Sequence, residues 1–143
     1  MPVRSSRSSR SSRSTGLTKD AGWQVGVSRT LPQSPSAVWE FISGPRGLEL
    51  WLGAGARLTP EQGAGYETDS GATGEVRGYR PGDRIRVTYG DTTVQVAVSA
   101  AGGGRSVLVF HQERMAGPEE RERQRAHWRR VMDRVAEALG RLG

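Results

Sequence analysis

His111 and Glu113 are the two residues whose types and spacing best suit proton transfer. They lie two positions apart in residues 106–113, a run rich in β-branched and aromatic residues that is typical of a strand. Both side chains are therefore expected on one face, together with Val107 and Val109. If this face is turned toward a long helix, burial would shift both pKa values, and the pair could act as base and acid near a cavity mouth. Otherwise His111 hydrogen-bonds a nearby loop and Glu113 ends the strand in water.

Two apolar residues of the same run lie on its other face. Leu108 and Phe110 alternate with the pair described above, so they point the opposite way. In a lone subunit they would then face solvent, which favours self-association into a homodimer through this surface. The alternative is that loops or the N-terminal segment cover them.

Large side chains elsewhere in the chain could form the walls of a cavity. Aromatic and Met walls give an apolar ligand contact area, while an indole or phenol group fixes its orientation. The same side chains could instead fill the core, because protein interiors are closely packed. With His111 and Glu113, the predicted ligand-binding residues are Trp39, Trp51, Tyr66, Trp128 and Met132.

The sequence contains no standard motif for binding a metal or a nucleotide. There is no cysteine and only two histidines, His111 and His127, so no standard set of metal ligands is available. The Gly-x-Ser-x-Gly elbow, the phosphate-binding loop, the His-Glu-x-x-His pair and the strand-linked Gly-x-Gly-x-x-Gly are all missing. We therefore predict no metal, no cofactor and no assigned catalytic residue.

The first 21 residues differ in composition from the rest of the 143-residue chain. They repeat Arg-Ser-Ser and contain four apolar residues, too few to offset the entropy of folding. We predict a disordered tail over residues 1–21 and one domain over residues 22–143. The tail accounts for most of the net charge of +6. The basic residues of the remainder are not interleaved with stacking aromatics, so no specific nucleic-acid partner is expected.

No apolar run approaches the roughly 18 residues that cross a bilayer, and the N-terminus lacks the apolar stretch of a secretory signal. We therefore expect a soluble, cytoplasmic protein without a membrane partner.

The elements that must position the candidate residues follow in a clear order. Residues 23–31 alternate as a strand, and Ser34-Pro35 then starts a short helix that ends at Gly44-Pro45. A second short helix over residues 46–53 precedes glycine-punctuated strands that continue to Met115. An amphipathic helix of roughly six turns follows Gly117-Pro118. This pattern predicts an α+β fold in which the last helix covers one face of an antiparallel sheet.

Six local strings follow one another in this element order: SPSAVW (34–39), LWLG (50–53), GEV (74–76), RPGDRI (80–85), FHQERM (110–115) and HW (127–128). In this order they resemble the START-like superfamily, and specifically its SRPBCC branch of proteins similar to the activator of Hsp90 ATPase (AHSA1-like). Together they cover about residues 22–139. The resemblance implies a helix-grip fold, in which a curved antiparallel sheet wraps around a long C-terminal helix and leaves a cavity between them.

The resemblance also implies a range of functions. Members of the superfamily hold lipids, polyketides, hormones or other apolar molecules in the cavity. We therefore expect this chain to bind a small apolar or amphipathic ligand between sheet and helix. One alternative is an interaction module similar to an Hsp90 co-chaperone domain, with a chaperone as partner. Another is catalysis similar to that of polyketide cyclases, with His111 and Glu113 as general acid and base.

Overall fold

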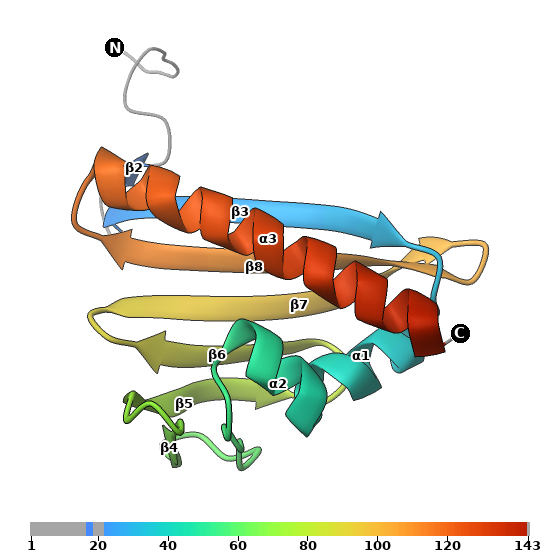
Figure 1. Ribbon diagram of the computed structural model, residues 1–143, viewed down its shortest axis with the longest axis horizontal. Helices are drawn as coiled ribbons and strands as arrows, with labels where there is room; N and C mark the ends of the chain where they lie inside the picture. The colour runs from blue at the N-terminus through green and yellow to red at the C-terminus, as the bar shows by residue number, and fades with distance from the viewer. Residues whose placement is uncertain (1–16, 19–21, 143) are drawn as a thin grey trace.

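The computed structural model describes residues 17–18 and 22–142 of the chain. These residues form one antiparallel sheet and three helices (Figure 1). In chain order the elements are β2 (Leu17–Thr18), β3 (Gly22–Leu31), α1 (Pro35–Ser43), α2 (Pro45–Trp51), β4 (Gly65–Glu67), β5 (Thr73–Arg80), β6 (Arg84–Tyr89), β7 (Thr92–Gly102), β8 (Arg105–Met115) and α3 (Pro118–Leu142).

The sheet has the strand order β2-β3-β8-β7-β6-β5-β4. The strands from β4 to β8 pair in sequence, whereas β3 pairs with β8, so the first long strand and the last lie side by side. All three helices lie on one face, with α3 running diagonally across β3, β8 and β7 (Figure 1). The predicted α+β, helix-grip arrangement is confirmed.

Local sequence explains how the two short helices are held together. The Ser34 hydroxyl accepts a hydrogen bond from the backbone N–H of Ala37 and caps α1, and Pro35 occupies the first turn. α2 follows directly after Gly44 and packs tightly on α1. A Cβ atom at Gly47 would lie 2.1 Å from the carbonyl oxygen of Phe41, so only glycine permits this approach.

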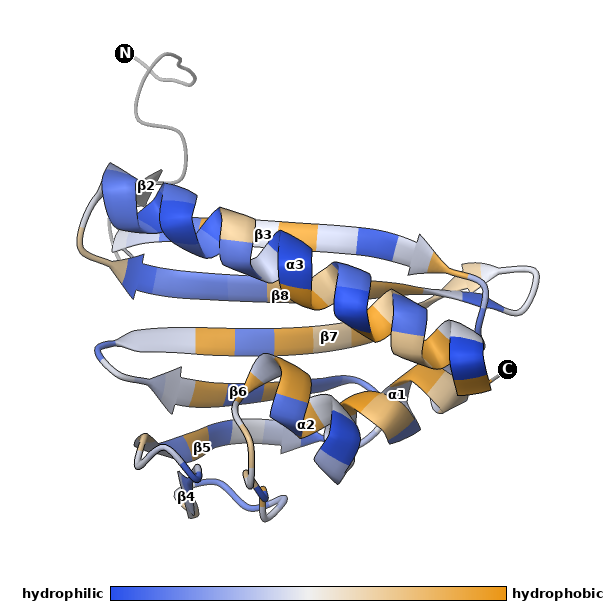
Figure 2. Ribbon diagram, in the orientation of Figure 1, coloured by the Kyte–Doolittle hydropathy of each residue, from blue (hydrophilic) through white to orange (hydrophobic). Residues whose placement is uncertain are grey.

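The core lies between the sheet and the helices. Orange apolar segments alternate with blue polar ones along the C-terminal half of α3 (Figure 2), and the buried residues of this helix include Trp128, Val131 and Val135. Strand and helix contributions to the core include Val76, Ile85, Val87, Val94, Val96, Leu108, Phe110, Trp128, Val131, Met132, Val135 and Leu139.

The side chains of β8 point the opposite way from the orientation predicted from the sequence. Leu108 and Phe110 are fully buried beneath α3, so the prediction that they face solvent is wrong. Alternation along a strand separates two sets of side chains, but it does not say which set points inward. A homodimer built on Leu108 and Phe110 therefore loses its basis.

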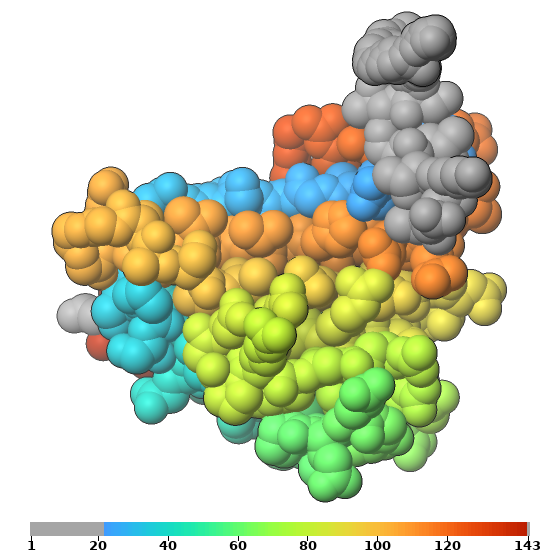
Figure 3. All heavy atoms as spheres, turned by 180° about the vertical axis from the view of Figure 1, so that it is seen from behind, coloured from blue at the N-terminus to red at the C-terminus, as the bar shows by residue number. Residues whose placement is uncertain are grey.

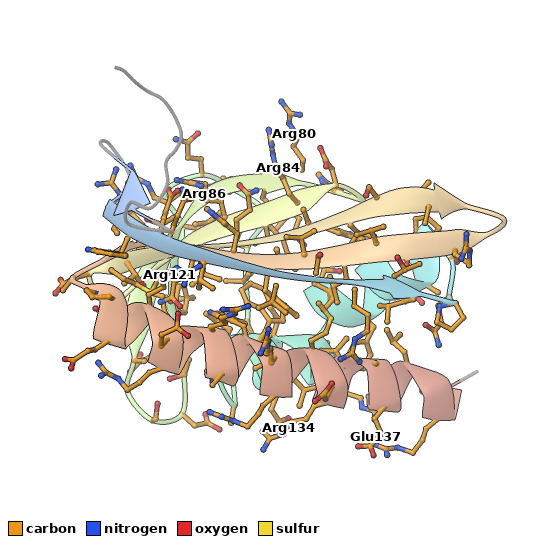
Figure 4. All side chains as sticks on the ribbon, turned by 90° about the horizontal axis from the view of Figure 1, so that it is seen from above. Arg80, Arg84, Arg86, Arg121, Arg134 and Glu137 are labelled. Atoms are coloured by element: carbon orange, nitrogen blue, oxygen red, sulfur yellow. The ribbon has the colours of Figure 1, made fainter. Side chains whose placement is uncertain are left out.

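The opposite face of the sheet is the outer face. Figure 3 views the molecule from that side, where β8, β7, β6 and β5 lie at the surface. Arg80 and Arg84 project from this face, away from α3 (Figure 4). None of the described helices is long and apolar enough to cross a membrane.

The N-terminal boundary differs in one respect from the predicted one. Leu17 and Thr18 fall within the predicted tail, yet they form β2 and pair with Trp23 and Gly22 of β3. The other residues of the predicted tail, 1–16 and 19–21, lie outside the described residues.

The inward orientation of Leu108 gives a direct stability prediction. Leu108→Ala should lower the free energy of unfolding by about 2–5 kcal/mol, because it opens a cavity under α3. Val109→Ala, one position along on the outer face, should cost less than about 1 kcal/mol. Urea denaturation measures both values, and a larger loss for Val109→Ala would contradict the observed orientation.

Candidate functional site

Four of the predicted wall residues are buried in the core. Trp51, Tyr66, Trp128 and Met132 are between 1 % and 6 % exposed. They come from α2, β4 and α3 and fill space between the helices and the sheet. The sequence placed them in the interior correctly, and there they contact other protein side chains.

The polar atoms of these aromatic side chains already have partners. The indole N–H of Trp51 donates to the carbonyl oxygen of Ile42 at 2.9 Å. The hydroxyl of Tyr66 donates to the carbonyl oxygen of Thr88 at 2.6 Å. Burial, with a smaller contribution from Tyr89, raises the pKa of Tyr66 to about 12. These contacts fix the side chains and satisfy the groups that would otherwise orient a ligand.

Trp39 lies apart from that group. It is half-buried on α1, and its ring meets Tyr79 of β5 edge to face, with 5.9 Å between the ring centroids. This arrangement is favourable for aromatic rings and closes the space between α1 and the sheet.

His111 and Glu113 lie on the outer face, not beside α3. The Nε2 atom of His111 is 2.7 Å from Oε1 of Gln24 on the neighbouring strand, and Glu113 accepts a hydrogen bond from Arg86. Burial lowers the pKa of His111, and Arg86 lowers it further, while Glu113 acts in the opposite direction. The structure therefore separates this pair from the predicted wall residues by the thickness of the sheet.

The residue that faces α3 between His111 and Glu113 is Gln112, which the sequence analysis passed over. Its side chain is 2 % exposed. Its Nε2 donates to the hydroxyl of Thr92 at 2.9 Å. Its Oε1 accepts from Nε2 of Gln124 and from the indole N–H of Trp128, both at 2.8 Å. The sequence did contain a signal for this position. Gln112 follows Leu108 and Phe110 at intervals of two residues, so all three side chains lie on the same face of the strand.

A pocket opens beside this network, between the β6–β7 turn and the first turns of α3. Its volume is about 270 Å³, and its lining combines polar and apolar surface. Tyr89 is one of its lining residues. The other lining residues include Asp91, Thr92, Gln112, Arg114, Glu120 and Gln124.

A larger and more apolar pocket lies between α1 and the C-terminal end of α3. Its volume is about 390 Å³. Polar residues also line it, and the guanidinium carbon of Arg46 lies 6.0 Å from the centre of the Phe41 ring. The apolar lining is Ala37, Phe41, Pro45, Leu139 and Leu142, and the polar lining includes Gln33, Glu40 and Arg46. We call it the α1–α3 pocket.

Metal binding finds no support in the described part of the chain, where no group of three or more His, Cys, Asp or Glu residues could hold an ion. The two described histidines lie on different elements, His111 on β8 and His127 on α3.

The arrangement of one curved sheet around a long terminal helix defines a helix-grip domain. The family model described as "Activator of Hsp90 ATPase homolog 1-like protein" matches residues 32–140. The chain therefore belongs to the AHSA1-like family of the SRPBCC superfamily, as the local strings had indicated. No curated protein sequence matches the chain.

Solved structures share the fold at low identity. A protein from Mesorhizobium loti is 19% identical, with a TM-score of 0.67 over 84% of this chain and 98% of that one. An HSP90 activator from Plasmodium falciparum is 16% identical, with a TM-score of 0.65 over 82% and 96% of the two chains. The Aha1 dimer from Colwellia psychrerythraea is 11% identical, with a TM-score of 0.66 over 81% and 95%. At these identities the likeness concerns the fold.

The two histidines give a pH prediction. Burial lowers the pKa of both His111 and His127 from the ordinary 6.5, so the unfolded chain takes up protons more readily than the folded one. Their contribution to stability should therefore be present at about pH 7 and lost as the pH falls toward about 5. Urea denaturation across this range should show a flatter pH dependence for the double variant His111→Gln/His127→Gln than for the wild type.

NMR titration of the imidazole protons provides the independent check. Both midpoints are expected below 6.5. A midpoint above that value for either ring, or an unchanged pH dependence in the double variant, would contradict the prediction.

Proposed function

We propose that this protein binds a small apolar or amphipathic molecule in the α1–α3 pocket. The main support for this proposal is the volume of the α1–α3 pocket together with its mostly apolar lining. Its volume of about 390 Å³ falls in the range of small-molecule sites, which are mostly apolar with a few polar groups. Burial of apolar ligand surface against Phe41, Leu139 and Leu142 would supply the driving force.

This location differs from the one expected from the sequence. The expected walls, including Trp51, Tyr66 and Trp128, are buried in the core, and none of these three residues lines the α1–α3 pocket. His111 and Glu113 lie on the outer face and take no part in the proposed binding.

Polar groups of the lining would orient an amphipathic ligand. The amide oxygen of Gln33 is buried and has no hydrogen-bond partner within the described part of the chain. This oxygen has almost no accessible surface, so a ligand N–H or O–H group would reach it only when the Gln33 side chain turns toward the pocket. Such a contact would give a donor to an acceptor that otherwise lacks one, which is favourable. Glu40 and Arg46 carry opposite charges on the same pocket.

A substitution that fills the α1–α3 pocket tests the proposal. Ala37 is exposed and lines the pocket, so Ala37→Trp should occupy the space without disturbing the core. Binding of the probe 1-anilinonaphthalene-8-sulfonate, followed by calorimetry, should weaken at least about tenfold. In the wild type, the probe should shift the amide NMR signals of Phe41 and Leu139.

The matched control is Ala72→Trp, an equal substitution at an exposed alanine before β5, away from the pocket. It should leave the affinity within about twofold of the wild type. Equal weakening by both substitutions, or no binding of the probe to the wild type, would overturn the proposal.

A further inference from the structure

One side of α3 carries a row of basic residues. Arg123, His127, Arg130 and Arg134 follow one another at steps of four, three and four, which places them on a single side of a helix. The row extends about 16 Å along the axis, at 1.5 Å per residue. The three arginines are exposed and His127 is half-buried. We call this row the arginine stripe.

The charges of the stripe are not neutralised by the described part of the chain. Several arginines elsewhere pair with carboxylates, as Arg29 does with Asp133 and Arg86 with Glu113. The guanidinium groups of Arg123, Arg130 and Arg134 make no ion pair or hydrogen bond with any described residue. Like charges one helical turn apart repel each other. In line with this, Arg130 and Arg134 add to the effect of burial and lower the pKa of His127.

Carboxylates bound the stripe at both ends. Glu119 and Glu120 lie in the first turn of α3. At the other end Glu137 pairs with Arg141. Figure 4 shows Arg134 and Glu137 on the side of α3 away from the sheet. Beside Arg134, the groove between α2 and α3 is lined by one residue of each sign from α2, Arg46 and Glu49. The uncompensated positive charge is thus confined to the middle of the helix.

We propose that the arginine stripe binds a short acidic segment of a partner protein, with carboxylates spaced to match the basic residues along about 16 Å. Opposite charges at matching spacing would relieve the repulsion within the stripe. A nucleic-acid backbone continues beyond this length and would run against the carboxylates at both ends. The bases of a nucleic acid would also find no exposed aromatic ring to stack on, because Leu142 is the only large hydrophobic side chain that is exposed among the described residues.

The probe for this proposal is a fluorescent alanine-rich helical peptide with glutamates at steps of four, three and four. A second peptide of the same composition, with its glutamates distributed around the helix, is the control ligand. Fluorescence anisotropy at about 50 mM salt keeps screening moderate. The first peptide should bind at least about tenfold more tightly than the second.

Two adjacent arginines provide the matched protein variants. Arg130 belongs to the stripe, whereas Arg129 lies about 100° around the helix axis from it, outside the stripe and toward the side where Asp133 pairs with Arg29 of β3. Arg130→Glu should weaken the first peptide by about tenfold or more, and Arg129→Glu by less than about threefold. The two variants carry the same change of charge, so a difference between them reports position.

Each other outcome overturns the proposal. Equal weakening of peptide binding by Arg130→Glu and Arg129→Glu would show that binding depends on net charge and not on the position of the arginine. Equal affinity for the two peptides would remove the role of spacing. Tighter binding of a short DNA duplex than of the first peptide would assign the stripe to nucleic acid, and no binding of the peptide would leave the stripe without an acidic partner.

Discussion

The contact of Trp128 with the concave face of the sheet holds this fold together. The indole ring stacks on Phe110 with 5.0 Å between the centroids, and its N–H donates to the buried Gln112. One side chain thus provides both apolar contact and a directional hydrogen bond. An apolar contact alone allows a helix to slide or rotate, whereas an unmade bond to a buried amide has a substantial energetic cost. The pair therefore fixes the rotation and the position of α3 on the sheet.

That placement of α3 determines what the molecule can offer to other molecules. With Trp128 turned inward, the opposite side of the helix presents its arginines to solvent. Leu139 and Leu142, three to four turns further on, come to lie against α1 and complete the α1–α3 pocket. The ligand site and the proposed interaction surface therefore depend on the same docking of one helix. Neither uses the outer face, where His111 and Glu113 are engaged with Gln24 and Arg86.

The sequence predicted the elements well and their mutual geometry less well. Gly44-Pro45, Gly117-Pro118 and the apolar stripe of α3 are local signals, so they located the helices. The alternation in β8 left open which face is inward, and the wrong choice exposed Leu108 and placed His111 inside. The α1–α3 pocket depends on the angle between two helices distant in sequence, which no local pattern specifies.

A double-mutant cycle on Trp128 and Gln112 tests this account most directly. The free energies of unfolding of Trp128→Phe, Gln112→Met and the double variant would be measured by urea denaturation. The account predicts a coupling energy of about 1–3 kcal/mol, because each single substitution leaves a buried polar group of the other residue without this partner. Additive losses, within about 0.5 kcal/mol, would contradict the claim that this contact docks α3.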